Sequence, residues 1–83
     1  MNTIILNNEI DFRNYLISNK DDIIKIYIFE DNLDNYIYFY AFLTNEVIAT
    51  KEKGSFENYY ILYKTLNNFN IEESNKTLKL FKN

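Results

Sequence analysis

The sequence of 83 residues contains no cysteine, histidine, proline or tryptophan, and it contains a single glycine. The absence of cysteine and histidine excludes disulfides, thiol nucleophiles, zinc fingers and the commonest general base. A single glycine also excludes a glycine-rich phosphate-binding loop. We therefore expect a fold held together by packing alone, with no catalytic, cofactor or metal site.

Length and charge limit the class of protein further. Eighty-three residues leave room for one hydrophobic core, so we expect a single domain over residues 1–83. Nine basic and twelve acidic side chains give a net charge of −3, which argues against nucleic acid as the partner. No stretch approaches the roughly 18 apolar residues of a membrane span, and the N-terminus lacks the basic region of a signal peptide. We expect a cytoplasmic protein with no membrane partner.

Aromatic side chains are abundant. They make up 18% of the chain, as eight tyrosines and seven phenylalanines, and they supply ample apolar area for a domain of this length. Asparagine is also frequent, but it accompanies Ile, Lys, Tyr and Phe, which all have codons made only of A and T. We attribute the asparagine content to an AT-rich genome, since apolar residues recur with regular periods between the asparagines, as in a folded chain.

The first part of the chain predicts a short strand, a helix and three paired strands. Thr3 to Leu6 is a short apolar run, and Asn8 is a good N-cap for a helix from Glu9 to about Ser18. Three segments rich in β-branched and aromatic residues follow, with polar turns between them, and they predict a hairpin and a third antiparallel strand. These segments are residues 23–29, 36–43 and 47–51.

The rest of the chain predicts a second helix and a last strand. Ser55 is a candidate cap for a helix that ends near Asn70, because apolar residues from Phe56 to Leu66 recur at three- and four-residue steps. A polar loop through residues 72–75 leads to a final strand over residues 76–81, which we expect at an edge of the sheet. The order βαβββαβ predicts an α+β fold: a single antiparallel sheet of four to five strands with two helices on one face.

Strand alternation predicts that the hairpin has two unlike faces. If Phe29 lies opposite Tyr36 and Tyr27 opposite Tyr38, one face is an apolar core under the helices. Its members are Ile24, Ile26, Ile28, Ile37, Phe39, Ala41 and Leu43. The other face collects rings around Lys25, namely Tyr27, Phe29, Tyr36, Tyr38, Tyr40 and Phe42.

The rings support two interpretations. Cross-strand aromatic pairs stabilise hairpins, and a second layer or a homodimer could cover them. A contiguous exposed aromatic surface is instead typical of a recognition site, because tyrosine is enriched at protein interfaces. On the second interpretation, the predicted partner-binding residues are the rings together with the acids of the adjacent loop. They are Tyr27, Phe29, Glu30, Asp31, Asp34, Tyr36, Tyr38 and Tyr40.

Two helices behind a sheet with rings on its open face resemble the RNA-binding RRM module. Residues 36–42 occupy the strand where that family keeps its RNP1 motif, but the basic residue and the glycines of that motif are missing here. The resemblance implies single-stranded nucleic acid as an alternative ligand.

No catalytic or metal-binding arrangement emerges from the polar residues. Glu30, Asp31 and Asp34 share one loop, but they lack the ladder of oxygen ligands and the distal glutamate of a calcium loop, so a solvated turn is favoured. Carboxylates and tyrosines can do acid and base work, yet no sequence pattern positions them. The chain is therefore expected not to be an enzyme.

The leading hypothesis is a small protein-binding inhibitor from a phage or mobile element. Phage-encoded antagonists of host defence, including anti-CRISPR proteins, are often short, acidic, cofactor-free single domains, and this chain is similar to them in those general properties. Acids beside aromatic rings would suit a bacterial partner whose own site is basic because it handles nucleic acid. The alternatives are the nucleic-acid-binding module and a homodimeric structural or antitoxin-type protein.

Overall fold

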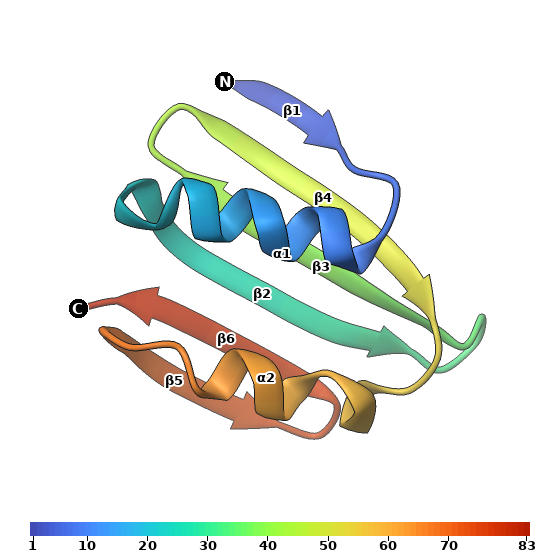
Figure 1. Cartoon of the computed structure of the whole chain (residues 1–83). Helices are drawn as coiled ribbons and strands as arrows, with labels where there is room; N and C mark the ends of the chain where they lie inside the picture. The colour runs from blue at the N-terminus through green and yellow to red at the C-terminus, as the bar shows by residue number, and fades with distance from the viewer.

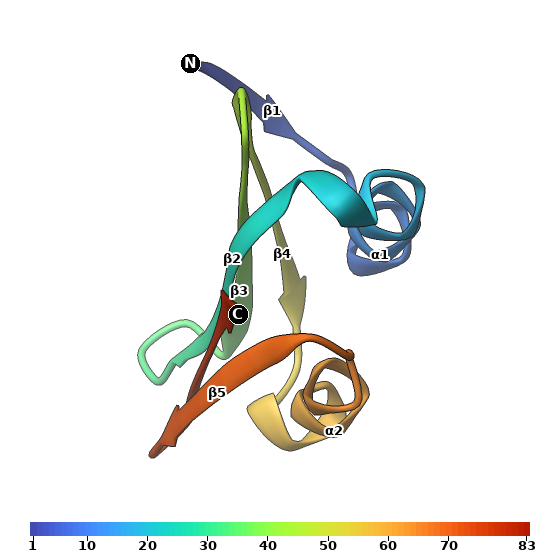
Figure 2. The same cartoon turned by 90° about the vertical axis from the view of Figure 1, so that its left-hand side faces the viewer.

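A computed structural model describes all 83 residues as a six-stranded sheet with both helices on one side (Figure 1). The strands are β1 (Asn2–Ile5), β2 (Ile23–Asp31), β3 (Tyr36–Leu43), β4 (Glu46–Lys53), β5 (Phe69–Ser74) and β6 (Thr77–Lys82). The helices are α1 (Glu9–Ser18) and α2 (Tyr60–Lys64), with 3₁₀ turns η1 (Lys20–Asp22) and η2 (Phe56–Asn58). The strand order is β1-β4-β3-β2-β6-β5, and Figure 2 shows the other side of the sheet uncovered.

The predicted antiparallel sheet of four to five strands is wrong. The sheet is mixed, because β1 pairs with β4 in parallel while every other pair of neighbours is antiparallel. The chain beyond β1 stays bound to β4, where the Leu6 N–H donates to the Ala49 carbonyl oxygen at 2.8 Å and the Thr50 hydroxyl donates to the Leu6 carbonyl oxygen at 2.9 Å. A four-residue apolar run carries no sign of its pairing direction, so composition could not reveal the parallel pair.

The second helix is much shorter than predicted. Instead of running from Ser55 to Asn70, the helical part consists of η2 and the five residues of α2. The Ser55 side chain makes no capping hydrogen bond, and the Phe56 N–H donates instead to Oε1 of Glu30 at 2.7 Å. Asn68 has a positive φ of 70°, which turns the chain out of the helical path. Local turn chemistry thus overrides the apolar spacing.

The segment predicted as helix end and polar loop forms β5. This strand pairs only with β6, and most of its side chains are exposed, so its stability comes from backbone pairing and requires no apolar alternation. Because β5 lies outside β6, the last strand is not the edge strand that we expected.

The core lies between the sheet and the helices. Phe39 on β3 is fully buried at the centre of this core. Its ring centroid lies 5.7 Å from that of Phe12 on α1 and 5.9 Å from that of Tyr63 on α2. The predicted helix from Glu9 to Ser18 is confirmed, and Oδ1 of Asn8 accepts a hydrogen bond from the Asp11 N–H at 2.8 Å, as expected of an N-cap.

Glu9 is a buried charge that joins the two helices. Its carboxylate accepts two hydrogen bonds from Arg13, at 2.6 and 3.0 Å, and a third from the Tyr63 hydroxyl at 2.6 Å. These bonds offset the cost of removing a carboxylate from water. The hydrogen bond to Glu9 also raises the pKa of Arg13, so the guanidinium group stays charged.

The hairpin of β2 and β3 is confirmed, but its register differs by two residues from the symmetric pairing. Phe29 lies opposite Tyr38 and Tyr27 opposite Tyr40, because β2 continues through Asp31 and the chain reverses within a shorter turn that ends at Asn35, where φ is 59°. A bulge between Ile23 and Lys25 also changes which isoleucine at the start of β2 belongs to the core, so the predicted core position of Ile24 is wrong. Ile24 is 49% exposed, and Ile23 is buried in its place.

Candidate partner-binding face

The side of the sheet opposite the helices carries a continuous set of rings. Cross-strand partners share a face, and the observed registers place seven aromatic side chains there. We call this surface the aromatic face, and its rings are Tyr27, Phe29, Tyr36, Tyr38, Tyr40, Phe42 and Phe81. The predicted placement of the first six is confirmed, and Phe81 joins them because β6 lies beside β2.

The rings pack against one another rather than standing apart. Phe29 stacks with Tyr38 at 5.3 Å between centroids and with Tyr40 at 6.1 Å, and it meets Tyr27 edge-on at 5.1 Å. All four rings are half-buried. Cross-strand packing therefore occupies much of the ring surface and makes the face rigid.

The tyrosine hydroxyls of this face are free to bind another molecule. Every buried polar side-chain atom in the protein has a hydrogen-bond partner, while the hydroxyls of Tyr27, Tyr36, Tyr38 and Tyr40 have none within the chain. These four hydroxyls are consequently open to solvent. A tyrosine that offers an apolar ring and an unused hydroxyl suits an interface.

Lysines lie over the rings. The ammonium group of Lys25 is 5.3 to 5.6 Å from the centroids of Tyr27, Phe42 and Phe81. Lys79 approaches Tyr27 from β6 at 5.2 Å, and Lys51 approaches Tyr36 from β4 at 4.8 Å. The three salt bridges of the protein involve none of these lysines. Cation–π contacts hold these side chains over the rings, and their charges remain unpaired.

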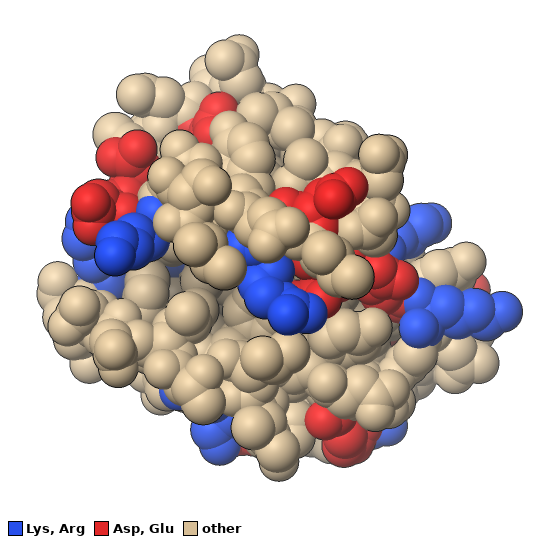
Figure 3. Space-filling model, viewed as in Figure 1, with Lys and Arg blue, Asp and Glu red and all other residues tan.

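The aromatic face differs in charge from the rest of the molecule. Strand register places four lysines on it, Lys25, Lys51, Lys53 and Lys79, and two carboxylates, Asp31 and Glu72. Its net charge is therefore +2. The other five basic and ten acidic residues of the chain sum to −5, which gives the total of −3. On the helix side, acidic and basic groups are interspersed (Figure 3). Total charge alone conceals this asymmetry.

Of the three predicted acidic residues, only Asp31 lies beside the rings. Glu30 lies on the helix side, where Oε2 accepts a hydrogen bond from Lys76 at 2.9 Å and only 8% of the side chain is exposed. The bond from Lys76, and then that from the Phe56 N–H, lowers the pKa of Glu30. Asp31 lies on the aromatic face opposite Tyr36 and accepts a hydrogen bond from the Leu33 N–H at 2.9 Å, while Asp34 is exposed in the turn.

The residues that sequence reasoning missed on this face come from β4 and β6, the strands on either side of the hairpin. Lys51 and Lys53 alternate with Thr50 and Glu52 on β4, and Lys79 and Phe81 alternate with Leu78 and Leu80 on β6. The same two-residue period that placed the hairpin rings could have assigned these side chains to the aromatic face. The strand that carries Lys51 was expected to follow the hairpin as its third antiparallel strand, whereas the place of β6 beside β2 could not be predicted.

Comparisons of the chain with protein families, with curated proteins and with solved structures found no match. None of its helices combines the length and the apolar character that crossing a bilayer requires.

Proposed function

We propose that the chain is a non-catalytic binding domain whose aromatic face docks on an acidic surface of a larger protein. One observation carries this proposal. A sheet face left uncovered by the helices presents seven rings together with lysines that have no carboxylate partner. Aromatic residues that present an apolar body and a polar tip are enriched at protein interfaces. Masking a site on that partner, as an inhibitor does, is the role we put forward.

The charge of the aromatic face favours an acidic partner over the basic one expected from the sequence. That expectation rested on Glu30, Asp31 and Asp34 lying beside the rings, but Glu30 is paired with Lys76 on the helix side. Lys25, Lys51 and Lys79 are the charges available on the face itself. Complementary charge steers association and selects partners, so carboxylates on the partner would meet these lysines.

The same charge argues against a homodimer formed face to face. A two-fold interface brings the same patch of two copies together. Two copies of a face with a net charge of +2 would then be brought together, because only Asp31 and Glu72 offset Lys25, Lys51, Lys53 and Lys79. Like charges in an interface cost affinity. We therefore expect a monomer in solution at moderate salt.

Single-stranded nucleic acid is the second candidate, favoured by the lysines that alternate with rings on neighbouring strands. Stacking of bases needs accessible ring faces, however, and Phe29 already stacks on Tyr38 and Tyr40 while Lys25 and Lys79 lie over Tyr27. Titration with single-stranded oligonucleotides at about 50 mM salt separates the two candidates, because binding to phosphates weakens steeply as salt rises.

The protein-binding proposal is tested by affinity capture with two variants of equal charge change. The first carries Lys51→Glu on the aromatic face; the control carries Lys64→Glu on the helix side. We expect the wild type and the control to retain the same acidic protein, and the face variant to bind it about tenfold or more weakly, because reversed charges repel the partner's carboxylates. Equal loss with both variants, or capture that oligonucleotides abolish, would contradict the proposal.

A further inference from the structure

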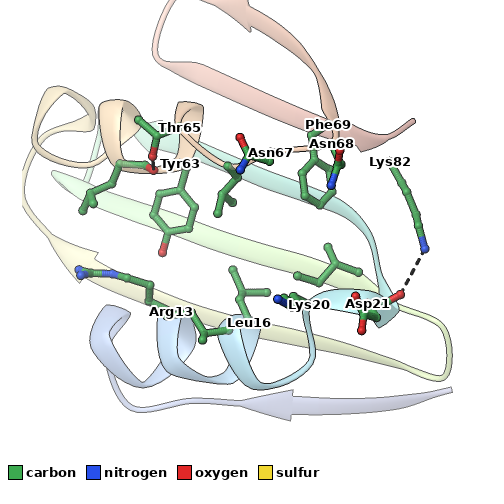
Figure 4. A pocket seen from close by; sticks show the side chains of 14 residues that line it. Arg13, Leu16, Lys20, Asp21, Tyr63, Thr65, Asn67, Asn68, Phe69 and Lys82 are labelled. Atoms are coloured by element: carbon green, nitrogen blue, oxygen red, sulfur yellow. Dashed lines mark hydrogen bonds between the residues drawn. The ribbon is translucent and has the colours of Figure 1, made fainter.

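A groove of about 720 Å³ lies on the helix side, between the second half of α1 and the chain that leads from α2 into β5 (Figure 4). Leu16 and Ile23 line it from one side, and Tyr63 and Phe69 from the other. The volume falls within the range of small-molecule sites, roughly 300 to 1,000 Å³. The aromatic face lies on the opposite side of the sheet, so this groove is a separate feature.

The groove exists because the two helices meet at one end only. The hydrogen bonds of Arg13 and Tyr63 to Glu9 join them there. Beyond that point α2 ends at Lys64, and the aliphatic side chains beside the gap have no cover. Ile17 is 63% exposed, Leu62 is 46% exposed and Leu66 is 36% exposed. Three exposed aliphatic residues around one groove form an apolar patch of the kind that binds a ligand.

The other end of the groove is basic. Lys20 and Lys82 lie there, and neither forms a salt bridge with a carboxylate. The Lys82 ammonium group donates a hydrogen bond only to the backbone carbonyl oxygen of Asp21, at 3.2 Å (Figure 4). Asp21 supplies the one carboxylate of the lining, and Arg13 at the far end is already neutralised by Glu9. An apolar groove with unpaired positive charge at one end is complementary to an amphipathic anion.

We propose that this groove binds a medium-chain aliphatic carboxylic acid. Its carboxylate lies between Lys20 and Lys82, and its alkyl chain extends over Leu16, Leu66 and Tyr63 towards Arg13. The lining runs from Arg13 on α1 to Lys20 on η1. Its α-helical part, from Arg13 to Ser18, is about 7.5 Å long at 1.5 Å per residue, and η1 extends it. That length accommodates an extended chain of medium size and sets an upper limit to it.

The test is calorimetric titration of the full chain with hexanoate, octanoate, decanoate and dodecanoate below their micelle concentrations. We expect affinity to rise by up to about fourfold for each methylene that the groove buries, then to level off when the chain fills it. Lys20→Gln and Lys82→Gln should each weaken decanoate binding about two- to fivefold, and Asp21→Asn should strengthen it. Lys51→Gln on the aromatic face is the control and should change nothing.

Two analogues of decanoate, one neutral and one cationic, decide the ligand class. Decanol and decylammonium should bind at least about fivefold more weakly than decanoate, and Leu62→Gln, a change at an exposed position, should weaken all three. Equal affinity for decanol would overturn carboxylate recognition. Absence of decanoate binding by folded wild-type chain would overturn the site itself, as would preference for an apolar peptide with a free C-terminal carboxylate. None of these results bears on the aromatic face, so the two proposals fail separately.

Discussion

The Tyr63 hydroxyl donates a 2.6 Å hydrogen bond to Oε2 of Glu9, so a side chain of α2 closes the shell of donors around a carboxylate of α1. Glu9 is 2% exposed and Tyr63 is equally hidden. The Glu9 N–H in turn donates to Oε1 of Glu52 on β4 at 2.8 Å. A single buried residue thereby links both helices and the sheet.

Removing the Tyr63 hydroxyl should destabilise the protein. Tyr63→Phe keeps the ring in the core but takes one of three side-chain donors from a buried carboxylate, which costs about 1.5 to 3 kcal/mol. The free energy of unfolding in urea measures the effect. Tyr60→Phe is the matched control, because the Tyr60 hydroxyl makes no hydrogen bond within the chain, and it should change stability by less than about 0.5 kcal/mol. Equal effects of the two substitutions would contradict the role of Glu9.

Tyr63 should also make the protein sensitive to alkali. Burial first, and then the hydrogen bond to Glu9, raises the pKa of Tyr63 far above its ordinary value of 10.0. A tyrosine that holds its proton more tightly when folded contributes full stability below the unfolded pKa, and that stability declines as pH rises above it. We expect the free energy of unfolding to fall from about pH 9 to about pH 12, and to fall less in Tyr63→Phe.

Tyr15 and Tyr59 contribute to the same decline. The hydrogen bond to Glu46 raises the pKa of Tyr15, and burial raises that of Tyr59. The measurement is therefore the difference between the pH profiles of Tyr63→Phe and the wild type. Parallel profiles would show that Tyr63 does not ionise more readily on unfolding.

The two predicted N-caps should respond differently to alanine. Asn8→Ala removes the acceptor of the Asp11 N–H and should cost about 1 kcal/mol. Ser55→Ala removes a side chain that makes no capping hydrogen bond, so stability should stay within about 0.5 kcal/mol. Urea denaturation of both variants provides the comparison. A larger cost at Ser55 would mean that it caps η2 after all.

Two apolar positions of α1 test where the core lies. Phe12 is fully buried against Phe39, and Phe12→Ala should cost about 3 to 5 kcal/mol. Ile10 is 62% exposed on the same helix, and Ile10→Ala should cost less than about 0.5 kcal/mol. Thermal and urea unfolding both report the difference. A strong effect at Ile10 would indicate that another molecule covers this side of α1.

Local signals in the sequence located the elements that depend on local chemistry. The helix from Glu9 could be predicted because Asn8 caps it and acids occupy its first turn, and the hairpin because its strands are rich in β-branched and aromatic residues and a polar turn separates them. The alternation of side chains along a strand predicted which side of the sheet carries the rings.

Features that depend on distant partners could not be predicted in the same way. The direction of β1 follows from its place beside β4, and β5 is a strand because β6 offers it a backbone ladder. Ile24 lies outside the core because of a bulge, and no residue at that position indicates a bulge in the sequence. The charge of the candidate site was misjudged partly for a similar reason, since Lys79 reaches the rings from β6, whose place beside β2 could not be predicted.

The parallel pairing of β1 implies an order of folding. Thr3 pairs with Val47, far along the chain, whereas β2, β3 and β4 are consecutive neighbours joined by short turns. Closing a long loop costs more chain entropy than closing a short one, so the meander should assemble first and β1 should dock last. We expect φ-values near zero for Ile4→Ala and higher values at Phe39; the reverse would indicate that the N-terminal strand belongs to the folding nucleus.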